Sequence, residues 1–114
     1  MAAIRGMKRG DVIVVAVQGD HGKPRPALVV QNDLITEIDT VLVCLLTTST
    51  EVESAFRFSV AASPANGLRA ESYVTLDKTT MVLRKKCGAV IGRLSGEQMT
   101  AINERLAFVL GLSG

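Results

Sequence analysis

Residues 22–30 read Gly22-Lys23-Pro24-Arg25-Pro26-Ala27-Leu28-Val29-Val30, a cation between two prolines directly before an apolar run. Pro24 fixes its own φ, and Pro26 disfavours the helical region for the residue before it, so the backbone at Arg25 is predicted to be extended. Residues 26–31 are expected to form a buried strand that begins at Pro26, where a missing N–H costs least. The stretch therefore predicts an arginine at the shoulder of a strand, where its planar guanidinium can bind a phosphate or a carboxylate. A solvated turn residue is the alternative interpretation of Arg25.

Other apolar runs of strand length are spread along the chain. Including the run above, strands are expected at residues 12–17, 26–31, 40–46, 56–60, 71–76, 81–83 and 88–92, with turn residues between them. A tight connection at residues 77–79 is expected to separate the fifth strand from the sixth. The clean alternation at residues 56–60 is typical of a strand with one wet face.

The periodicity becomes helical near the C-terminus. Ser95 followed three residues later by Gln98 has the spacing of a capping box, and Gly111 is a plausible helix stop. Apolar residues recur at helical intervals between them: Met99, Ile102, Leu106 and Val109. Short strands followed by a single terminal helix predict a mainly β fold, a small twisted barrel or half-barrel.

The composition bounds the class of protein. A chain of 114 residues fits one domain, 1–114, and 47% hydrophobic residues with 21% charged argue against disorder. No apolar run reaches the length of a membrane helix, and residues 1–8 lack the apolar core of a secretory signal, so a cytoplasmic location is expected. A net charge of +2 and 4% aromatic residues exclude a broad, sequence-blind nucleic-acid surface. Cys44 and Cys87 have no metal-ligand spacing, so we expect reduced thiols, no bound metal and no cofactor.

Several short motifs follow one another over nearly the whole chain. They are Arg9-Gly10-Asp11-Val12, Arg25-Pro26-Ala27-Leu28-Val29-Val30, Leu45-Leu46-Thr47-Thr48, Asn66-Gly67-Leu68, Ser72-Tyr73-Val74-Thr75-Leu76-Asp77-Lys78 and Gly88-Ala89-Val90-Ile91-Gly92-Arg93-Leu94. None is specific alone, but the combination resembles the MazF/PemK toxins of bacterial type II toxin–antitoxin systems. The resemblance implies an SH3-like small barrel of the CcdB/MazF type with a C-terminal α-helix. It also implies a homodimer, and a sequence-specific endoribonuclease (mRNA interferase) that needs no metal.

Metal-free RNA cleavage uses the neighbouring 2′-hydroxyl as nucleophile and leaves a 2′,3′-cyclic phosphate and a 5′-hydroxyl end. The protein must help to remove one proton, supply another and stabilise charge on the phosphorane. The arginine and threonine that serve the family fall on Arg25 and Thr47. The resemblance thus implies that Arg25 holds phosphate oxygens and takes part in proton transfer, and that Thr47 orients or stabilises the same phosphate. From the residues alone, a hydroxyl that caps the turn after a strand is the favoured interpretation of Thr47.

The proton-transfer partner is less well defined by the sequence. Family members usually carry a Glu or a His in the loop before the arginine. Here Asp20 stands where many relatives have Glu, and His21 is not a strict match to the histidine of some members. His21 titrates near neutrality, as a proton shuttle requires, although a lone loop histidine is commonly just solvated. Asp77 matches an acidic position used by some members, and a turn residue is its alternative interpretation.

Further polar side chains are candidates for RNA contacts. Lys23, Thr48 and Ser49 flank the two principal candidates and can donate hydrogen bonds to phosphates. The basic run at residues 84–86 can meet phosphates or lie beside a dimer partner, although charge runs are commonly solvated. Cys87 has no histidine or acid set against it, so cysteine catalysis is rejected.

The partners implied by the resemblance are single-stranded RNA, in particular mRNA, and a cognate antitoxin whose acidic, disordered segment folds across the toxin. Two other functions share the expected fold. One is a CcdB-like toxin that binds gyrase without nuclease activity, although this chain has no Trp of the kind those toxins use. The other is a non-catalytic RNA-binding barrel.

Overall fold

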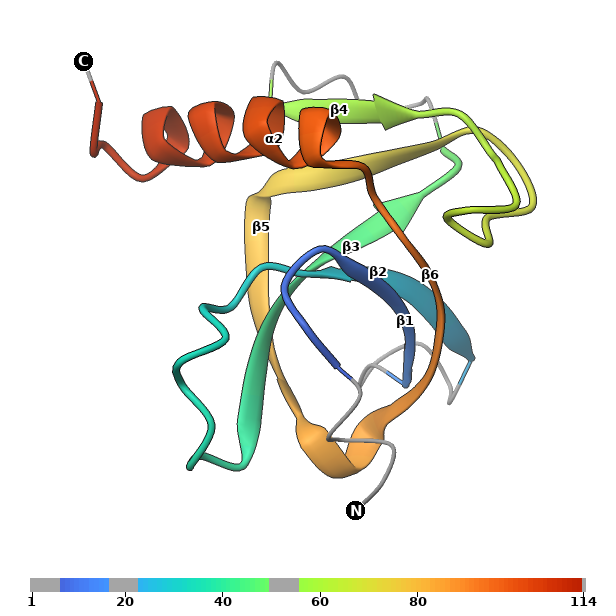
Figure 1. Ribbon diagram of the computed structural model, residues 1–114, viewed down its shortest axis with the longest axis vertical. Coiled ribbons are helices and arrows are strands. Elements are labelled where there is room, and N and C mark those ends of the chain that lie inside the picture. Colours follow the sequence, from blue (N-terminus) through green and yellow to red (C-terminus); the bar gives the residue numbers. More distant parts are fainter. Residues whose placement is uncertain (1–6, 17–22, 50–55, 114) are drawn as a thin grey trace.

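The structure is a computed structural model that describes residues 7–16, 23–49 and 56–113 (Figure 1). Its elements are β1 (Asp11–Ala16), β2 (Pro24–Val29), β3 (Thr40–Thr47), β4 (Arg57–Val60), β5 (Ser72–Leu83), the 3₁₀ turn η1 (Arg84–Lys86), β6 (Cys87–Arg93) and α2 (Gly96–Val109). The mainly β fold with a terminal helix is therefore confirmed. No helix of these ranges is long and apolar enough to cross a membrane.

The six strands form one antiparallel sheet in the order β4-β5-β3-β2-β1-β6. The sheet curls strongly, as Figure 1 shows, but β4 and β6 remain its two edges. The small barrel is thus an open one.

Two strands differ from the sequence-based prediction by more than one residue at an end. The first is β2, which begins at Pro24 and not at Pro26. Both prolines pair only with β1, and the pairs with β3 begin at Ala27. The prolines therefore precede the part of β2 that is hydrogen-bonded on both sides, where a missing N–H would be costly.

The second difference is β5, for which a tight connection at residues 77–79 was expected. The expectation is wrong, because β5 is one strand of 12 residues. Val74 pairs with Leu46 and Thr79 with Cys44, so both halves of β5 run antiparallel to the same neighbour and the extra residues form a bulge. Figure 1 shows β5 turning between a half beside β4 and a half beside β3.

Each face of the sheet buries its own apolar cluster, because successive side chains of a strand point to opposite faces. The helix-side core comprises Val12, Leu28, Cys44, Leu46, Val60, Val74, Leu76, Leu94, Ile102 and Leu106. The opposite core comprises Ile13, Val15, Ala27, Val29, Val41, Val43 and Val82, with Leu45 and Cys87 packed against it. The candidate site lies at the margin of this second cluster.

The predicted ends of the helix are confirmed. The Ser95 hydroxyl accepts a hydrogen bond from Gln98 N, and the Gln98 side chain accepts one from Ser95 N, which completes the capping box. Gly111 adopts a φ of 75°, and the next N–H, of Leu112, donates to Ala107 O at 2.7 Å. This is a Schellman-type stop, and it needs the left-handed conformation that glycine supplies.

A turn after β4 packs tightly on β6 and partly covers that edge. Asn66, which is buried, donates through its amide to Ala61 O and accepts hydrogen bonds from Ser63 N and Leu68 N. A Cβ at Gly92 would lie 2.3 Å from the Asn66 carbonyl carbon, so only glycine allows this approach.

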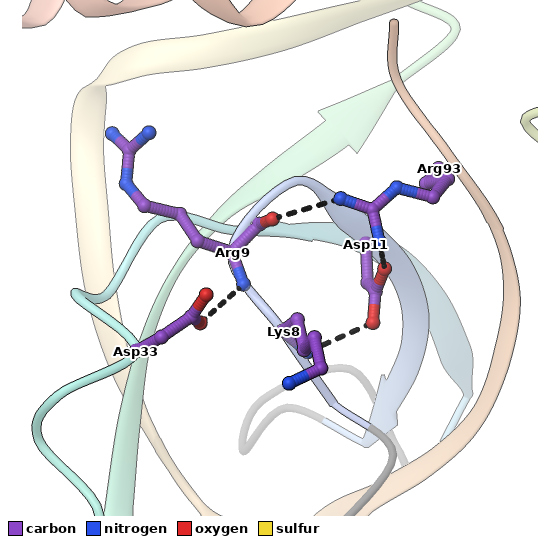
Figure 2. A network of polar contacts seen from close by, with 5 residues as sticks. All are labelled: Lys8, Arg9, Asp11, Asp33 and Arg93. Atoms are coloured by element: carbon purple, nitrogen blue, oxygen red, sulfur yellow. Dashed lines mark hydrogen bonds and ion pairs between the residues drawn. The ribbon is translucent and has the colours of Figure 1, made fainter. Parts of the chain in front are cut away.

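A polar network ties the start of β1 to the end of β6 (Figure 2). The buried Asp11 carboxylate accepts a hydrogen bond from Lys8 N at 2.8 Å and forms an ion pair with Arg93 at 3.1 Å. Arg9 N donates to Asp33 at 2.7 Å, which joins the loop after β2 to the same corner. The network fixes the end of β1 that is remote from Arg25, because Arg25 pairs with Val15 at the other end.

Candidate active site

The strand register brings Arg25 and Thr47 toward each other. Across β2 and β3, Val29 pairs with Val43, Leu28 with Cys44 and Ala27 with Leu45. Each step back along β2 is matched by one step forward along β3, so the same register continued by two residues beyond the last pair would set Arg25 opposite Thr47. The two sit at one end of neighbouring strands.

Both side chains also belong to one face of the sheet. Arg25 lies two residues before Ala27, and Ala27 belongs to the core on the face opposite the helix. Thr47 lies two residues after Leu45, which packs against that same core. Alternation along a strand therefore gives Arg25 and Thr47 the same face, at the margin of the apolar cluster. Each is partly buried.

The Thr47 hydroxyl is held by the backbone that follows it. Its Oγ1 accepts a hydrogen bond from Ser49 N at 3.1 Å, so the turn-capping interpretation of this residue is correct. A hydroxyl that accepts still has its own O–H to donate. The cap thus fixes the oxygen and leaves a donor for a further group.

Arg57 of β4 supports the same turn, and the sequence did not predict this role. Its Nη1 donates to Ser49 O at 2.9 Å. The alternation at residues 56–60 predicted that one face of this strand is exposed to solvent. Which loop lies beside that face depends on the pairing of β4 with β5. The link holds the segment after β3 against the sheet.

The other site residues predicted from the sequence lie around Arg25 and Thr47, elsewhere in the fold or outside the described residues. Lys23, Thr48 and Ser49 are exposed and flank the two strand ends, as expected. Asp20 and His21 lie outside the described residues. The basic run forms η1, the 3₁₀ turn between β5 and β6.

Asp77 is exposed on the β5 bulge. Burial raises the pKa of the Cys44 thiol; a hydrogen bond with Thr79 and the charge of Arg9 lower it, and the Asp77 carboxylate raises it. The role of Asp77 stays a prediction.

The other thiol has no acid or base set beside it. Burial also raises the pKa of Cys87, against a smaller lowering by Arg84. A nucleophilic cysteine needs a lowered pKa, so both thiols are poor candidates for catalysis. Within the described ranges, no three His, Cys, Asp or Glu side chains are grouped so that they could hold a metal ion.

One aromatic residue of this face was not among the predicted site residues. Tyr73 pairs directly with Thr47 on one side and with Ser59 on the other, so all three side chains share a face. The sequence shows Tyr73 within one of the family motifs, but alternation along β5 leaves the choice of face open.

Comparisons with known proteins agree with this architecture. The family described as PemK-like, MazF-like toxins of type II toxin–antitoxin systems matches residues 8–110. A Mycolicibacterium smegmatis protein named probable endoribonuclease MazF is 35% identical over 109 residues, which cover 95% of this chain and 100% of the relative. The chain therefore belongs to the PemK/MazF family of toxins, as its motifs predicted.

Solved structures show the same fold. The Mycobacterium tuberculosis toxin MazF-mt6 is 26% identical, with a TM-score of 0.76 over 91% of this chain and 99% of that one. A mycobacterial endoribonuclease in complex with its cognate antitoxin is 27% identical, with a TM-score of 0.75 over 95% and 98% of the two chains.

Proposed function

We propose that this toxin is a sequence-specific endoribonuclease that cleaves single-stranded RNA, mRNA in particular, without a metal ion or cofactor. The observation that carries the proposal is the β2–β3 register, which pairs Ala27 with Leu45 and, continued by two residues, would set Arg25 opposite Thr47 on one face. Family membership and the name of the relative at 35% identity support it. We further propose that residues 1–114 act as one domain in the cytoplasm.

In the proposed mechanism, the 2′-oxygen attacks the adjacent phosphorus and the bond from phosphorus to the 5′-oxygen breaks. The guanidinium of Arg25 donates two hydrogen bonds to the non-bridging oxygens, where negative charge grows in the transition state. The Thr47 O–H donates to the same phosphate, because its oxygen is already held by Ser49 N. The proton from the 2′-hydroxyl passes to a base, and an acid protonates the leaving 5′-oxygen. The products are a 2′,3′-cyclic phosphate and a 5′-hydroxyl end.

The test is to incubate purified protein with a long RNA in the presence of a chelator and to map the ends. Cuts at one short motif with cyclic phosphate and 5′-hydroxyl ends are expected. The control RNA carries a single 2′-deoxy sugar at the cleaved position, which removes the nucleophile, and it should stay intact. Intact RNA together with stalled gyrase would identify a gyrase-binding toxin, and RNA that is bound but uncut would identify a non-catalytic barrel.

We propose Asp20 or His21 as the source of proton transfer, because both precede β2 in the chain and Arg25 lies in that strand. A histidine in this role imposes a rate change between pH 5 and 8. His21→Ala should therefore flatten the pH profile in that range, and Asp20→Asn should not. An unchanged profile in His21→Ala would remove histidine from the mechanism.

We also propose that the toxin is a homodimer joined through an apolar surface at the end of α2. Leu42 and Met81 pair across β3 and β5 and are 42% and 65% exposed. Leu110 and Leu112 lie beside Leu42 along one groove. A second copy of the chain would cover these side chains. Met81→Glu should give a monomer in sedimentation experiments, and a dimer that persists would place the interface elsewhere.

The antitoxin is proposed to act through an acidic segment that brings carboxylates to Arg25. A carboxylate matches the guanidinium fork as a phosphate does, so the segment would compete with RNA. Inhibition by the cognate antitoxin should therefore weaken as RNA concentration rises. Inhibition that is independent of RNA would indicate a different surface.

A further inference from the structure

The face that holds Arg25 and Thr47 continues across β5 and β4 with a tyrosine at its centre. Thr47 of β3 pairs with Tyr73 of β5, and Tyr73 pairs with Ser59 of β4. Directly opposed residues of an antiparallel pair have Cβ atoms about 5 Å apart on the same face. Tyr73 is thus the next side chain beyond Thr47 in the direction away from Arg25.

The surroundings of Tyr73 suit a ring that binds a ligand. The two residues opposed to it, Thr47 and Ser59, are short and do not cover a ring. Tyr73 is partly exposed, and among the described residues its ring has no aromatic or cationic partner and its hydroxyl has no hydrogen bond. The other aromatic contacts, Phe56 with Phe108 and Phe58 with Arg105, involve residues of β4, its flank and the helix. An aromatic ring that is partly exposed on a polar face and packs on no other ring or cation offers a flat apolar surface to a ligand.

We propose that Tyr73 stacks on an RNA base that flanks the scissile phosphate and thereby contributes to the choice of cleavage site. The inference rests on the proposed ribonuclease function, because it takes the phosphate to lie between Arg25 and Thr47. Every base offers a π-face, so one exposed ring beside the phosphate can hold the neighbouring nucleotide unstacked from the rest of the RNA. The proposed role of Tyr73 is to bind the base, and proton transfer does not involve it.

The protein carries its own probe for the proposal, because it has one Tyr and no Trp. Tyrosine emission therefore reports on Tyr73 alone. The ligand is an oligonucleotide spanning the mapped cleavage motif, with a 2′-deoxy sugar at the cleaved position so that it binds without being cut. Saturating binding should quench the emission. An abasic residue at the stacked position should prevent most of the quenching.

Cleavage kinetics give a second measurement. Tyr73→Leu should lower kcat/KM by about tenfold to a hundredfold, mainly through KM, which is the range for loss of one stacked base. Tyr73→Phe, which keeps the ring, should restore most of that loss. The abasic substrate should lower kcat/KM of the wild type by a similar factor. It should lower kcat/KM of Tyr73→Leu little further, because that variant has already lost the stacking.

Each contrary outcome has a distinct meaning. If wild-type protein cuts RNA but its emission is unchanged on binding, or if the abasic residue costs Tyr73→Leu as much as the wild type, the stacking proposal is overturned and the nuclease stands. If wild-type protein cuts no RNA, the proposed function fails, and this inference fails with it.

Discussion

The hydroxyl oxygen of Thr47 accepts a hydrogen bond of 3.1 Å from the backbone N–H of Ser49. The bond uses one lone pair and leaves the O–H as a donor, so the structural role of this side chain is compatible with the chemical role proposed for it. Substitution tests whether this hydroxyl contributes to cleavage.

Thr47→Val keeps the shape of the side chain and removes the hydroxyl. We expect the single-turnover rate of RNA cleavage to fall by about tenfold to a thousandfold, the cost of losing a donor to developing charge. Thr47→Ser keeps the donor and should retain most of the activity. Equal rates for the Val and Ser variants would show that the hydroxyl contributes nothing to cleavage.

Gly92→Ala tests the packing of the turn on β6. A Cβ would lie 2.3 Å from the Asn66 carbonyl carbon and 2.5 Å from Ala65 O, both backbone atoms. The clash should lower the free energy of unfolding by about 2–3 kcal/mol, measured by urea titration. Gly96→Ala is the matched control, since it meets nothing within 4 Å and should leave stability unchanged or raise it by up to about 1 kcal/mol. Equal midpoints for the two variants would contradict the close approach.

Asp11 and Arg93 should contribute unequally to stability although they form one ion pair. The Arg93 side chain is 58% exposed, so Arg93→Ala should cost less than about 1 kcal/mol. Asp11 is buried and also accepts the Lys8 N–H, so Asp11→Ala should cost about 1–3 kcal/mol. Thermal unfolding of both variants measures which one loses more stability. A larger loss for Arg93→Ala than for Asp11→Ala would contradict the prediction.

The two thiols should react slowly at neutral pH, because burial raises the pKa of both Cys44 and Cys87. Alkylation followed by mass spectrometry should label the partly exposed Cys87 first, at a rate that rises steeply with pH. A raised pKa in the folded state favours the neutral thiol, so its contribution to stability is complete below the unfolded pKa. That contribution should be lost as the pH rises above about 9.0. Rapid labelling of Cys44 at pH 7 in folded protein would contradict the burial.

Local signals predicted much of the fold. The capping box at Ser95, the stop at Gly111 and the strand after Pro26 depend on neighbouring residues only, and each was found. The turn expected at residues 77–79 failed for a different reason. A short polar segment within a strand can form either a turn or a bulge. Pairing with a distant strand, here β3, decides between them.

The candidate site also combines features that local sequence predicts with features that depend on distant strand pairing. Arg25 and Thr47 are candidates from motifs, and strand alternation assigns both to one face. The Arg57 bond to Ser49 O and the position of Tyr73 beside Thr47 depend on the pairing of β4 and β3 with β5, which a single sequence does not reveal.

The most direct measurement of the central claim is the cleavage rate of Arg25→Ala on an RNA that carries the mapped motif. We predict a loss of at least about a hundredfold, because the guanidinium stabilises charge that grows only in the transition state. Lys8→Ala is the charge-matched control, since Lys8 is exposed and precedes the opposite end of β1 from Val15, the partner of Arg25. Its rate should stay near that of the wild type. A folded Arg25→Ala protein that cuts the RNA as fast as Lys8→Ala would contradict the assignment of the active site.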